Sequence, residues 1–324
     1  MDISVVLATY NRASVLQETL RTLAQLVCPE DLRWELVVVD NNSTDSTPGV
    51  VEAFAANALF PVRYVLETTQ GRAAALNTGI DVAKGRIVAF TDDDVLIHSG
   101  WLIGLKQTFD DFDCAAVAGR VIPLWNNAKP DWLEMQDQQA VVNFDLGEDS
   151  KEINFAPLGV NSAFRREVFG RYGVFRLDLG VRGEKHTITC DDTEFGGRLT
   201  AAGEKIVYCP AAVIYHPVDA LRTTKQYFLT WSYYNGVSLT RMEGLPKEGV
   251  SYFGVPRWHY RDMASNLLRW MLSVHPQKRF RYKLRTYRSI GIIVESRRLS
   301  RLDCSKIVES RIASRDLTRI AHRD

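Results

Sequence analysis

"GRAAALNTGIDVAKGRIVAFTDDD", residues 71–94, runs from a helical pattern through one short apolar strand into three consecutive aspartates. Residues 71–83 predict a helix that ends at Lys84-Gly85. The segment "RIVAF" (86–90) predicts a buried strand. Adjacent carboxylates repel one another by about 1 kcal/mol per close pair even in water. A buried strand that leads directly into three of them is therefore the feature that the rest of the chain has to explain.

The sequence before this stretch repeats the same alternation of strand and helix. Apolar runs predict strands at 3–8, 35–40 and 62–66, and helical patterns follow the first two of them. Repeated β–α units predict an α/β fold with a parallel, doubly wound sheet. In such a sheet, ligands bind at the carboxyl ends of the strands.

Composition and cysteine content narrow the class of protein. The chain has 324 residues, of which 46% are hydrophobic and 24% charged, as in ordinary globular proteins with a sizeable core. Its five cysteines are scattered and form no CxxC pair, which favours reduced thiols in a cytosolic setting. There is no signal-peptide pattern and no apolar run near the roughly 18 residues of a spanning helix. We expect a cytoplasmic protein, and peripheral contact with the inner face of the cell membrane stays open.

Polar side chains follow three of the predicted strands where each strand ends. They are Thr9-Tyr10-Asn11, Asp40-Asn41-Asn42 and Asp92-Asp93-Asp94. We expect these groups to converge on one edge of the sheet, where a divalent cation would hold the carboxylates together. Oxygen ligands suit Mg²⁺ or Mn²⁺. In D-x-D spacing Asp92 and Asp94 share a side, and Asp94 is the expected direct ligand. The competing interpretation is a solvated acidic loop.

Several segments, in order, carry a family resemblance. They are "SVVLATYNRASVLQETLRTL", "ELVVVDNNSTDST", the stretch 71–94 and "DDTEFGGRL…PAAVIYHPV". Together they resemble glycosyltransferase family 2, over roughly residues 1–220. The resemblance implies a GT-A fold, an inverting mechanism, a D-x-D metal site and a nucleotide-diphosphate-sugar donor, with UDP expected. It divides the chain into a catalytic domain, 1–222, and an aromatic, then basic, mainly helical region, 223–324.

The resemblance implies substrate-binding roles for residues in all of these segments. They are Thr9, Tyr10, Asn11, Arg12, Asp40, Asn42, Arg72, Asn77, Asp92, Asp93, Trp101, Asn161 and Ser162. Asp40 would read the imide N–H of the base, unless it only caps a helix. Arg72 begins a helix whose N-terminus suits the diphosphate. Asn77 would hold loops together, Trp101 would offer a ring to the acceptor unless it is ordinary packing, and Asn161 and Ser162 would line the donor sugar.

The pair Asp191-Asp192 matches the family's Glu-Asp acidic pair, whose second member usually serves as the base. Because the first member here is Asp, the assignment between the two neighbours stays open, and helix capping is the simpler alternative. As the base, Asp192 would take the proton of an acceptor hydroxyl. His216, in "AVIYHP", matches a further metal or diphosphate ligand, although an isolated histidine is commonly structural.

These features favour a metal-dependent transferase that builds a cell-surface glycan, glycolipid or polysaccharide. The alternatives are a degenerate nucleotide-sugar-binding protein, which the retained carboxylates oppose, and a sugar-nucleotide pyrophosphorylase. The glycine-free "LATYNRAS" lacks the phosphate loop of a pyrophosphorylase and the GxGxxG of a dehydrogenase. No nucleic-acid-binding motif is present.

Charge is divided unevenly along the chain. Residues 255–324 hold 17 Lys and Arg against 6 Asp and Glu, which is a net charge of +11, whereas residues 1–254 carry −10. Apolar residues 267, 268, 271 and 272 lie among the basic ones. Amphipathic helices on an anionic bilayer are one interpretation. A helical cap or a dimer arm with a solvated basic face is the other, and an oligomer stays open.

Overall fold

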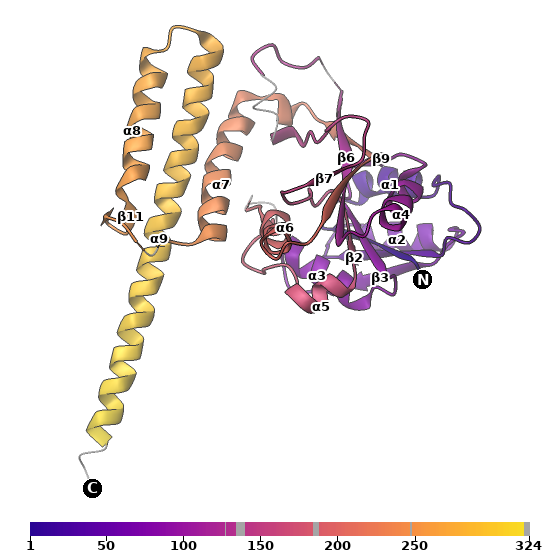
Figure 1. The fold of residues 1–324 in the computed structure, drawn as a ribbon, viewed down its shortest axis with the longest axis horizontal. Helices are drawn as coiled ribbons and strands as arrows, with labels where there is room; N and C mark the ends of the chain where they lie inside the picture. The colour runs from indigo at the N-terminus through magenta and orange to yellow at the C-terminus, as the bar shows by residue number, and fades with distance from the viewer. Residues whose placement is uncertain (127, 134–139, 184–187, 247, 321–324) are drawn as a thin grey trace. The chain divides into compact units, whose positions relative to one another are not determined.

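The computed structural model describes residues 1–324 apart from 127, 134–139, 184–187, 247 and 321–324 (Figure 1). The chain forms two compact units, residues 1–224 and 225–324. The elements of the first unit are β1 (Ile3–Thr9), α1 (Ala13–Leu23), β2 (Trp34–Asp40), α2 (Thr47–Ala55), β3 (Val62–Leu66), α3 (Arg72–Val82), β4 (Ile87–Thr91), β5 (Leu96–Ile97), α4 (Trp101–Asp111), β6 (Ala116–Trp125), β7 (Lys151–Ile153), β8 (Asn161–Arg165), α5 (Glu167–Tyr172), α6 (Asp191–Ala201), β9 (Ile206–Val218) and η2 (Leu221–Thr223).

The main sheet of the first unit is mixed. Its strand order is β3-β2-β1-β4-β8-β6-β9-β5, and β7 pairs with β9. The strands β1 to β4 are parallel to one another, as the sequence predicts. However, β8 lies antiparallel between β4 and β6, so the predicted parallel arrangement extends only from β3 to β4 in the strand order. Helices flank this sheet, and the predicted α/β fold is confirmed.

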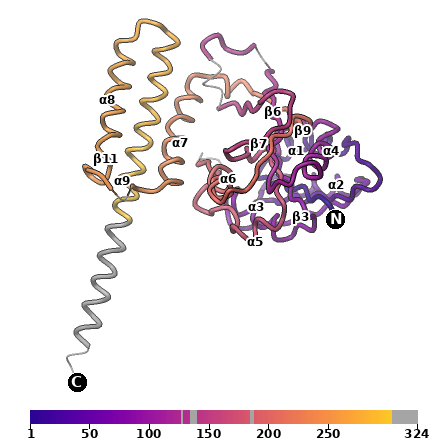
Figure 2. Tube along the Cα trace, in the orientation of Figure 1, coloured from indigo at the N-terminus to yellow at the C-terminus, as the bar shows by residue number. Residues whose placement is uncertain are grey.

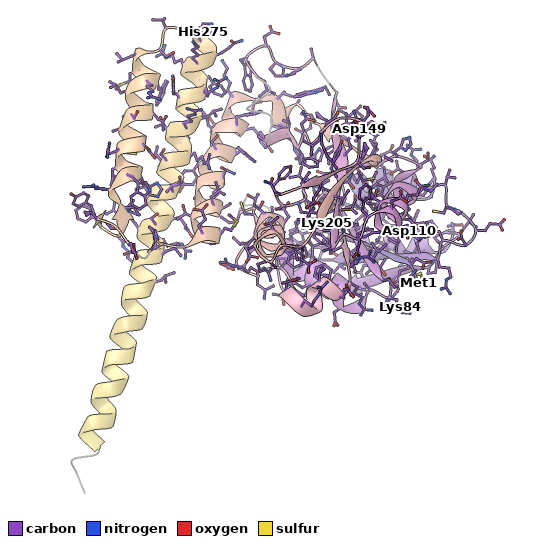
Figure 3. All side chains as sticks on the ribbon, in the orientation of Figure 1. Met1, Lys84, Asp110, Asp149, Lys205 and His275 are labelled. Atoms are coloured by element: carbon purple, nitrogen blue, oxygen red, sulfur yellow. The ribbon has the colours of Figure 1, made fainter. Side chains whose placement is uncertain are left out.

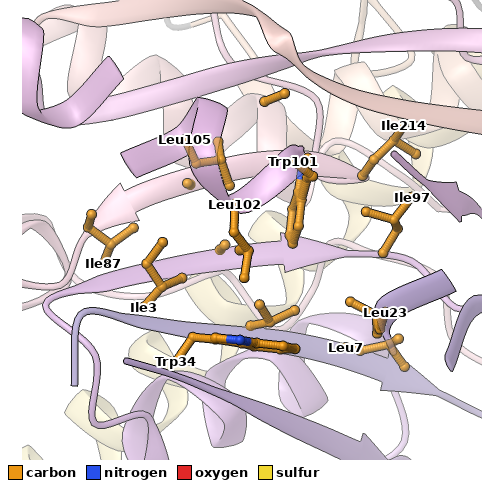
Figure 4. Packing of buried hydrophobic residues seen from close by; sticks show 14 of the residues in the cluster. Ile3, Leu7, Leu23, Trp34, Ile87, Ile97, Trp101, Leu102, Leu105 and Ile214 are labelled. Atoms are coloured by element: carbon orange, nitrogen blue, oxygen red, sulfur yellow. The ribbon is translucent and has the colours of Figure 1, made fainter. Parts of the chain in front are cut away.

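The inner parallel strands β1, β2 and β4 are buried on both faces, which explains their apolar runs, whereas the edge strand β3 is partly exposed. In β1, Ile3, Val5 and Leu7 pack into one cluster, and Val6 packs into the cluster on the opposite face. The first cluster also contains Trp34 and residues of α1 and α4 (Figure 4). Burying one such side chain stabilises the fold by about 1.5–3 kcal/mol. Both helix layers are thereby fixed against the sheet whose edge carries the polar residues.

One long strand brings a later part of the chain to this edge. The sequence predicts a strand at "KIVYCP" and a separate segment at "AVIYHPV", but residues 206–218 form the single strand β9. It runs beside β6, and the register between them shifts at Gly119/Arg120 (Figure 2). Beyond this irregularity β9 stays paired with β6 up to Val218, and this part of the strand carries His216.

The second unit is helical and is built around α9. Its elements are α7 (Lys225–Glu243), β10 (Ser251–Tyr252), β11 (Val255–Pro256), α8 (Arg257–Leu272) and α9 (Pro276–Ile320). Both α7 and α8 pack against α9. Two glycines let α7 and α9 approach closely: a Cβ on Gly236 would lie 2.2 Å from the Arg288 carbonyl oxygen, and one on Gly291 would lie 2.1 Å from that of Tyr233. Across the described part of the chain, no helix combines the length and the hydropathy that crossing a bilayer requires.

Candidate active site

The polar groups predicted to converge do lie at one edge of the sheet. Thr9 and Asp40 are register partners at the ends of β1 and β2, and Thr91 pairs with Leu7 of β1. The three aspartates therefore begin beside the end of β1. The Thr9 hydroxyl donates to Asp93 Oδ2 over 2.7 Å, which ties the first polar group to the third.

Asp93 faces inward and supports the acidic loop. Besides the Thr9 bond, its Oδ1 accepts from Arg12 Nη1 at 2.7 Å, and the Thr19 hydroxyl lies 2.9 Å from its carbonyl oxygen. Burial raises the pKa of Asp93 to about 6, while the Arg12 charge opposes the rise. Because its side chain is enclosed by protein donors, Asp93 holds the loop in shape beneath its two neighbours.

Arg72, at the first position of α3, joins the two acidic segments. Its Nη2 lies 2.9 Å from Asp92 Oδ1 and its Nη1 lies 2.6 Å from Asp191 Oδ2. Burial disfavours the charge of Arg72, but Asp92 and Asp191 outweigh it and raise its pKa. One guanidinium thus connects the loop after β4 with the start of α6, which lies 119 residues after Arg72 in the chain.

The neighbours Asp191 and Asp192 have different surroundings. Asp191 is buried and paired with Arg72. Asp192 instead accepts from two backbone amides, Gly159 at 2.7 Å and Thr193 at 2.6 Å. Burial and then the charge of Asp191 raise the pKa of Asp192, and Arg72 opposes this. Within the described residues, no ion pair engages Asp192, so its carboxylate is the one suited to accept a proton.

A second group forms around Asp94 and His216. Asp94 Oδ1 lies 3.7 Å from His216 Nε2, and Asp94 Oδ2 accepts from Arg12 at 3.0 Å and from Arg222 at 3.1 Å. Burial opposes ionisation of Asp94, but His216, Arg222 and Arg12 outweigh it and lower its pKa. His216 Nδ1 lies 3.1 Å from the Pro217 carbonyl oxygen, which in the neutral ring leaves Nε2 as the acceptor. The lone pair on Nε2 then faces Arg222 Nη1 at 3.1 Å, beside Asp94 Oδ1.

The sequence analysis misses Arg222. This residue lies in η2, shortly after β9, and its Nη1 is 3.1 Å from His216 Nε2. It is 128 residues from Asp94, and no local motif marks it. The signal available was its position six residues after His216, at the end of the strand that leads to the site.

Comparison with known proteins identifies the chain. The family model described as "Glycosyl transferase family 2" matches residues 4–173. The chain belongs to glycosyltransferase family 2. The succinoglycan biosynthesis protein ExoM of Rhizobium meliloti is 29% identical over 225 residues, which cover 69% of each chain. A glucosyl-dolichyl phosphate glucuronosyltransferase of Haloferax volcanii is 27% identical and covers 75% of this chain and 78% of its own. This family 2 chain is a glycosyltransferase, as the sequence predicts.

Solved structures give the same fold. The mannosyltransferase PcManGT from Pyrobaculum calidifontis, solved with GDP-Man and Mn²⁺, has a TM-score of 0.60 at 21% identity and covers 90% of this chain and 86% of its own. TarS residues 1–349 from S. aureus, solved with UDP-GlcNAc, has a TM-score of 0.53 at 16% identity, with 90% of each chain covered. The family 2 chain thus has the predicted GT-A fold.

Three residues with an expected ligand role lie inside the protein instead. Trp101 has no exposed surface, and its indole N–H donates to Asn161 Oδ1 at 2.8 Å. Asn161 is equally buried and donates to the carbonyl oxygens of Arg120 and Ala212. Ser162, the next residue of β8, is also buried. In this structure Trp101 and Asn161 brace α4 against the sheet. Because a contacting group needs accessible atoms, contact of these three residues with a sugar would require the protein to rearrange, and it stays a prediction.

Asp40, which the sequence predicts to bind the nucleotide base, is also buried. Asp40 has no exposed surface, since its Oδ1 accepts from the Ser43 amide and its Oδ2 accepts from the Tyr64 hydroxyl at 2.8 Å. Burial, and then the Asp40 carboxylate, raise the pKa of Tyr64 to about 12. An imide N–H reaches Asp40 only after the Tyr64 hydroxyl has moved away, so a role for Asp40 in base recognition stays a prediction.

The remaining predicted residues divide into loop supports and accessible groups. Asn77 pairs with both backbone groups of Phe175, which fits the loop-holding role. Asn11 accepts from the Thr44 amide at 2.7 Å and so joins the loops after β1 and β2. Tyr10 is half-buried, and Asn42 is exposed with a left-handed backbone, φ 64°. Both are accessible to a ligand at the same edge.

Proposed function

We propose that this glycosyltransferase moves a sugar from a nucleotide-diphosphate donor, UDP-linked in the first instance, to a hydroxyl of a glycan, glycolipid or polysaccharide acceptor, with inversion. The observation that carries the proposal is the pairing of one compensated and one uncompensated carboxylate, Asp191 and Asp192, beside Arg72. The named relatives support the acceptor class, because they include succinoglycan biosynthesis and O-antigen chain proteins. PcManGT and TarS, solved with GDP-Man and UDP-GlcNAc, support a nucleotide-sugar donor.

Asp192 is the proposed general base. Its carboxylate takes the proton of the acceptor hydroxyl while that oxygen forms a bond to the anomeric carbon. The bond between the anomeric carbon and the diphosphate oxygen breaks, and the nucleoside diphosphate leaves with the electron pair. Attack from the side opposite the leaving group inverts the anomeric centre. A raised pKa makes Asp192 a better proton acceptor than an ordinary aspartate, whereas Arg72 neutralises Asp191.

Three arginines supply positive charge for the diphosphate. Arg72, Arg12 and Arg222 all contact the acidic cluster, and guanidinium groups bind phosphate oxygens with paired hydrogen bonds. Negative charge grows on the leaving diphosphate during transfer. Cations fixed beside it lower the energy of that state more than that of the bound donor.

The side chains of Asp94 and His216 are also of the kind that binds a divalent cation, Mn²⁺ or Mg²⁺. Asp94 Oδ1 and His216 Nε2 face each other at 3.7 Å, and two ligands of one ion with bonds of about 2.1 Å lie at most about 4 Å apart. Asp92 would be the third ligand but is paired with Arg72, and no group of three such side chains is assembled among the described residues. When bound, the ion would neutralise charge on the leaving diphosphate. Arg222 would first have to leave His216.

We place the transferase in the cytoplasm, with peripheral contact at the inner face of the cell membrane. The basic helical unit supports this contact, since its charge is opposite to that of anionic lipid. Such a contact would keep the enzyme beside a lipid-linked acceptor.

A thermal-shift screen tests the proposal. UDP-, GDP- and dTDP-sugars are compared with and without Mn²⁺, and a ligand at a hundredfold excess over its Kd stabilises the folded state by about 2.7 kcal/mol. We expect one nucleotide class to raise Tm, more so with Mn²⁺, and to release nucleoside diphosphate when acceptor is added. Binding without any turnover would favour the degenerate binding protein. Formation of nucleotide sugar from nucleoside triphosphate and sugar phosphate would favour a pyrophosphorylase.

A further inference from the structure

The turn between α8 and α9 exposes a cluster of large apolar side chains. Leu268 is 53% exposed, Met271 60%, Leu272 70% and Val274 97%. The first three lie at helical spacing on one face of α8, and the fourth precedes His275, which Figure 3 labels at the turn. Contiguous exposed apolar surface of this kind marks a contact with a partner or a membrane. We call residues 267–285 the hairpin tip.

The hairpin tip is strongly basic. Residues 263–294 contain seven Lys and Arg and no Asp or Glu. Asp262 and Glu295 bound this stretch, and Glu295 is already engaged by Arg241 and Arg298. This stretch of two neighbouring helices therefore carries a net positive charge of seven.

Aromatic rings alternate with these cations beside the apolar cluster. The Lys283 ammonium lies 5.3 Å from the ring centre of Trp270, and Arg269 and Arg285 lie 5.8 and 5.9 Å from that of Tyr282. Trp and Tyr with Lys and Arg form the layer that proteins place at lipid headgroups, while apolar side chains reach the acyl chains. Arg269 and Trp270 lie between Leu268 and Met271 in the sequence. Lys278 and Arg279 follow Val274 in the first turn of α9, so cations and rings lie beside the apolar side chains at the hairpin tip.

A membrane explains this combination better than a second copy of the chain. Two hairpin tips would bring two clusters of positive charge together, and their repulsion would oppose the apolar contact. An anionic bilayer satisfies both surfaces at once. We propose that the hairpin tip inserts into one leaflet of an anionic membrane, with Leu268, Met271, Leu272 and Val274 among the acyl chains. This rests on the membrane contact proposed above and specifies the element that makes it.

Sedimentation of the full chain with vesicles tests the insertion. Vesicles of phosphatidylcholine alone are compared with vesicles that contain about one third phosphatidylglycerol, at about 0.1 M and about 1 M NaCl, where the Debye lengths are about 10 and about 3 Å. We expect binding to the anionic vesicles at low salt. Leu272→Asp should weaken it at least tenfold, because a carboxylate then enters the apolar layer. Leu59→Asp, at a fully exposed apolar residue of the first unit, is the matched control and should bind as wild type.

Further measurements make the outcome decisive. Val274→Asp repeats the test at a turn residue should Leu272→Asp fold poorly, and Trp270→Phe should remove quenching of tryptophan fluorescence by brominated lipid. The proposal is overturned if wild type fails to sediment with anionic vesicles at low salt, or if both aspartate variants bind as wild type. A solution oligomer that Leu272→Asp dissociates would assign the tip to self-association instead. Transfer to a soluble acceptor is followed separately, so its loss would count against the transferase and not against insertion.

Discussion

Replacement of Asp192 by asparagine separates the base from its structural surroundings. The two carboxylate oxygens accept from Thr193 N at 2.6 Å and from Gly159 N at 2.7 Å. An asparagine keeps one oxygen and turns an NH₂ group toward the other backbone N–H. One donor, partly buried at Gly159 or exposed at Thr193, is then left without an acceptor, which costs at most about 1–3 kcal/mol of folding free energy. We therefore expect a measurable fall in the unfolding free energy of the Asp192→Asn variant, without loss of the fold.

The effect on catalysis should be much larger than this structural cost. Loss of a positioned base lowers kcat by about 10²–10⁴-fold. Donor affinity should stay near that of wild type, because Arg72, Arg12 and Arg222 keep their positions. In wild type, the acid limb of the pH profile of kcat/KM should fall above the 3.8 of an ordinary aspartate, since burial and Asp191 raise the pKa of Asp192.

The assay is release of nucleoside diphosphate with saturating donor and a hydroxyl acceptor, beside a direct measurement of donor Kd. Asp113→Asn is the matched control, because the Asp113 side chain is fully exposed. Asp191→Asn should instead weaken donor binding, since it releases Arg72 from its position. Wild-type turnover by Asp192→Asn, or a loss that the change in Kd accounts for in full, would refute the assignment of Asp192 as the base.

Three more predictions concern other contacts. Arg222→Gln should weaken donor binding by roughly tenfold to a hundredfold, because a charged hydrogen bond is lost. It should tighten binding of Mn²⁺ alone, because Asp94 then has no ion pair with residue 222. Titration calorimetry measures both affinities, and unchanged values would contradict the prediction. Gly291→Ala should lower stability to urea by about 1–3 kcal/mol, whereas Gly197→Ala, with open space around its Cβ, should not; equal midpoints would contradict this. Burial opposes ionisation of Glu295, but hydrogen bonds from Arg298 and Arg241 outweigh it and lower its pKa. The contribution of Glu295 to stability should therefore be present above about pH 4.5 and be lost as the pH falls further. Glu295→Gln should remove this pH dependence of thermal unfolding.

The arrangement of the first four strands was predictable because their sequence pattern is compatible with a parallel sheet and with few other arrangements. Continuous apolar runs such as 35–40 need cover on both faces, and β–α alternation makes such strands parallel. Parallel register then places Thr9, Asp40 and the aspartates after β4 at the same edge. The antiparallel position of β8 carried no such signal, since the five residues Asn161–Arg165 show no pattern that distinguishes antiparallel from parallel pairing.

The site itself was predictable only in part. Acidic residues directly after a buried strand are visible in the sequence because their charge is out of place there. The acidic pair at the start of α6 stands out only through the family resemblance, since carboxylates are common at helix N-termini. A tryptophan near such a cluster looks the same in the sequence whether it packs inside the protein or faces a ligand. Only the structure, through the bond from Trp101 to Asn161, shows that this one packs inside. Arg222 belongs to the site through folding alone, since β9 carries the chain to Asp94 from 128 residues away.

The Arg72 bridge has a consequence for molecules that are still being synthesised or have been cut. Arg72 contacts partners 20 and 119 residues along the chain, so Asp92 and Asp191 meet only after both segments have folded together. A nascent chain that has released residue 94 but not residue 191 contains the aspartates after β4 and lacks the proposed base. We therefore expect chains that end before α6 to be inactive both in sugar transfer to an acceptor and in hydrolysis of the donor.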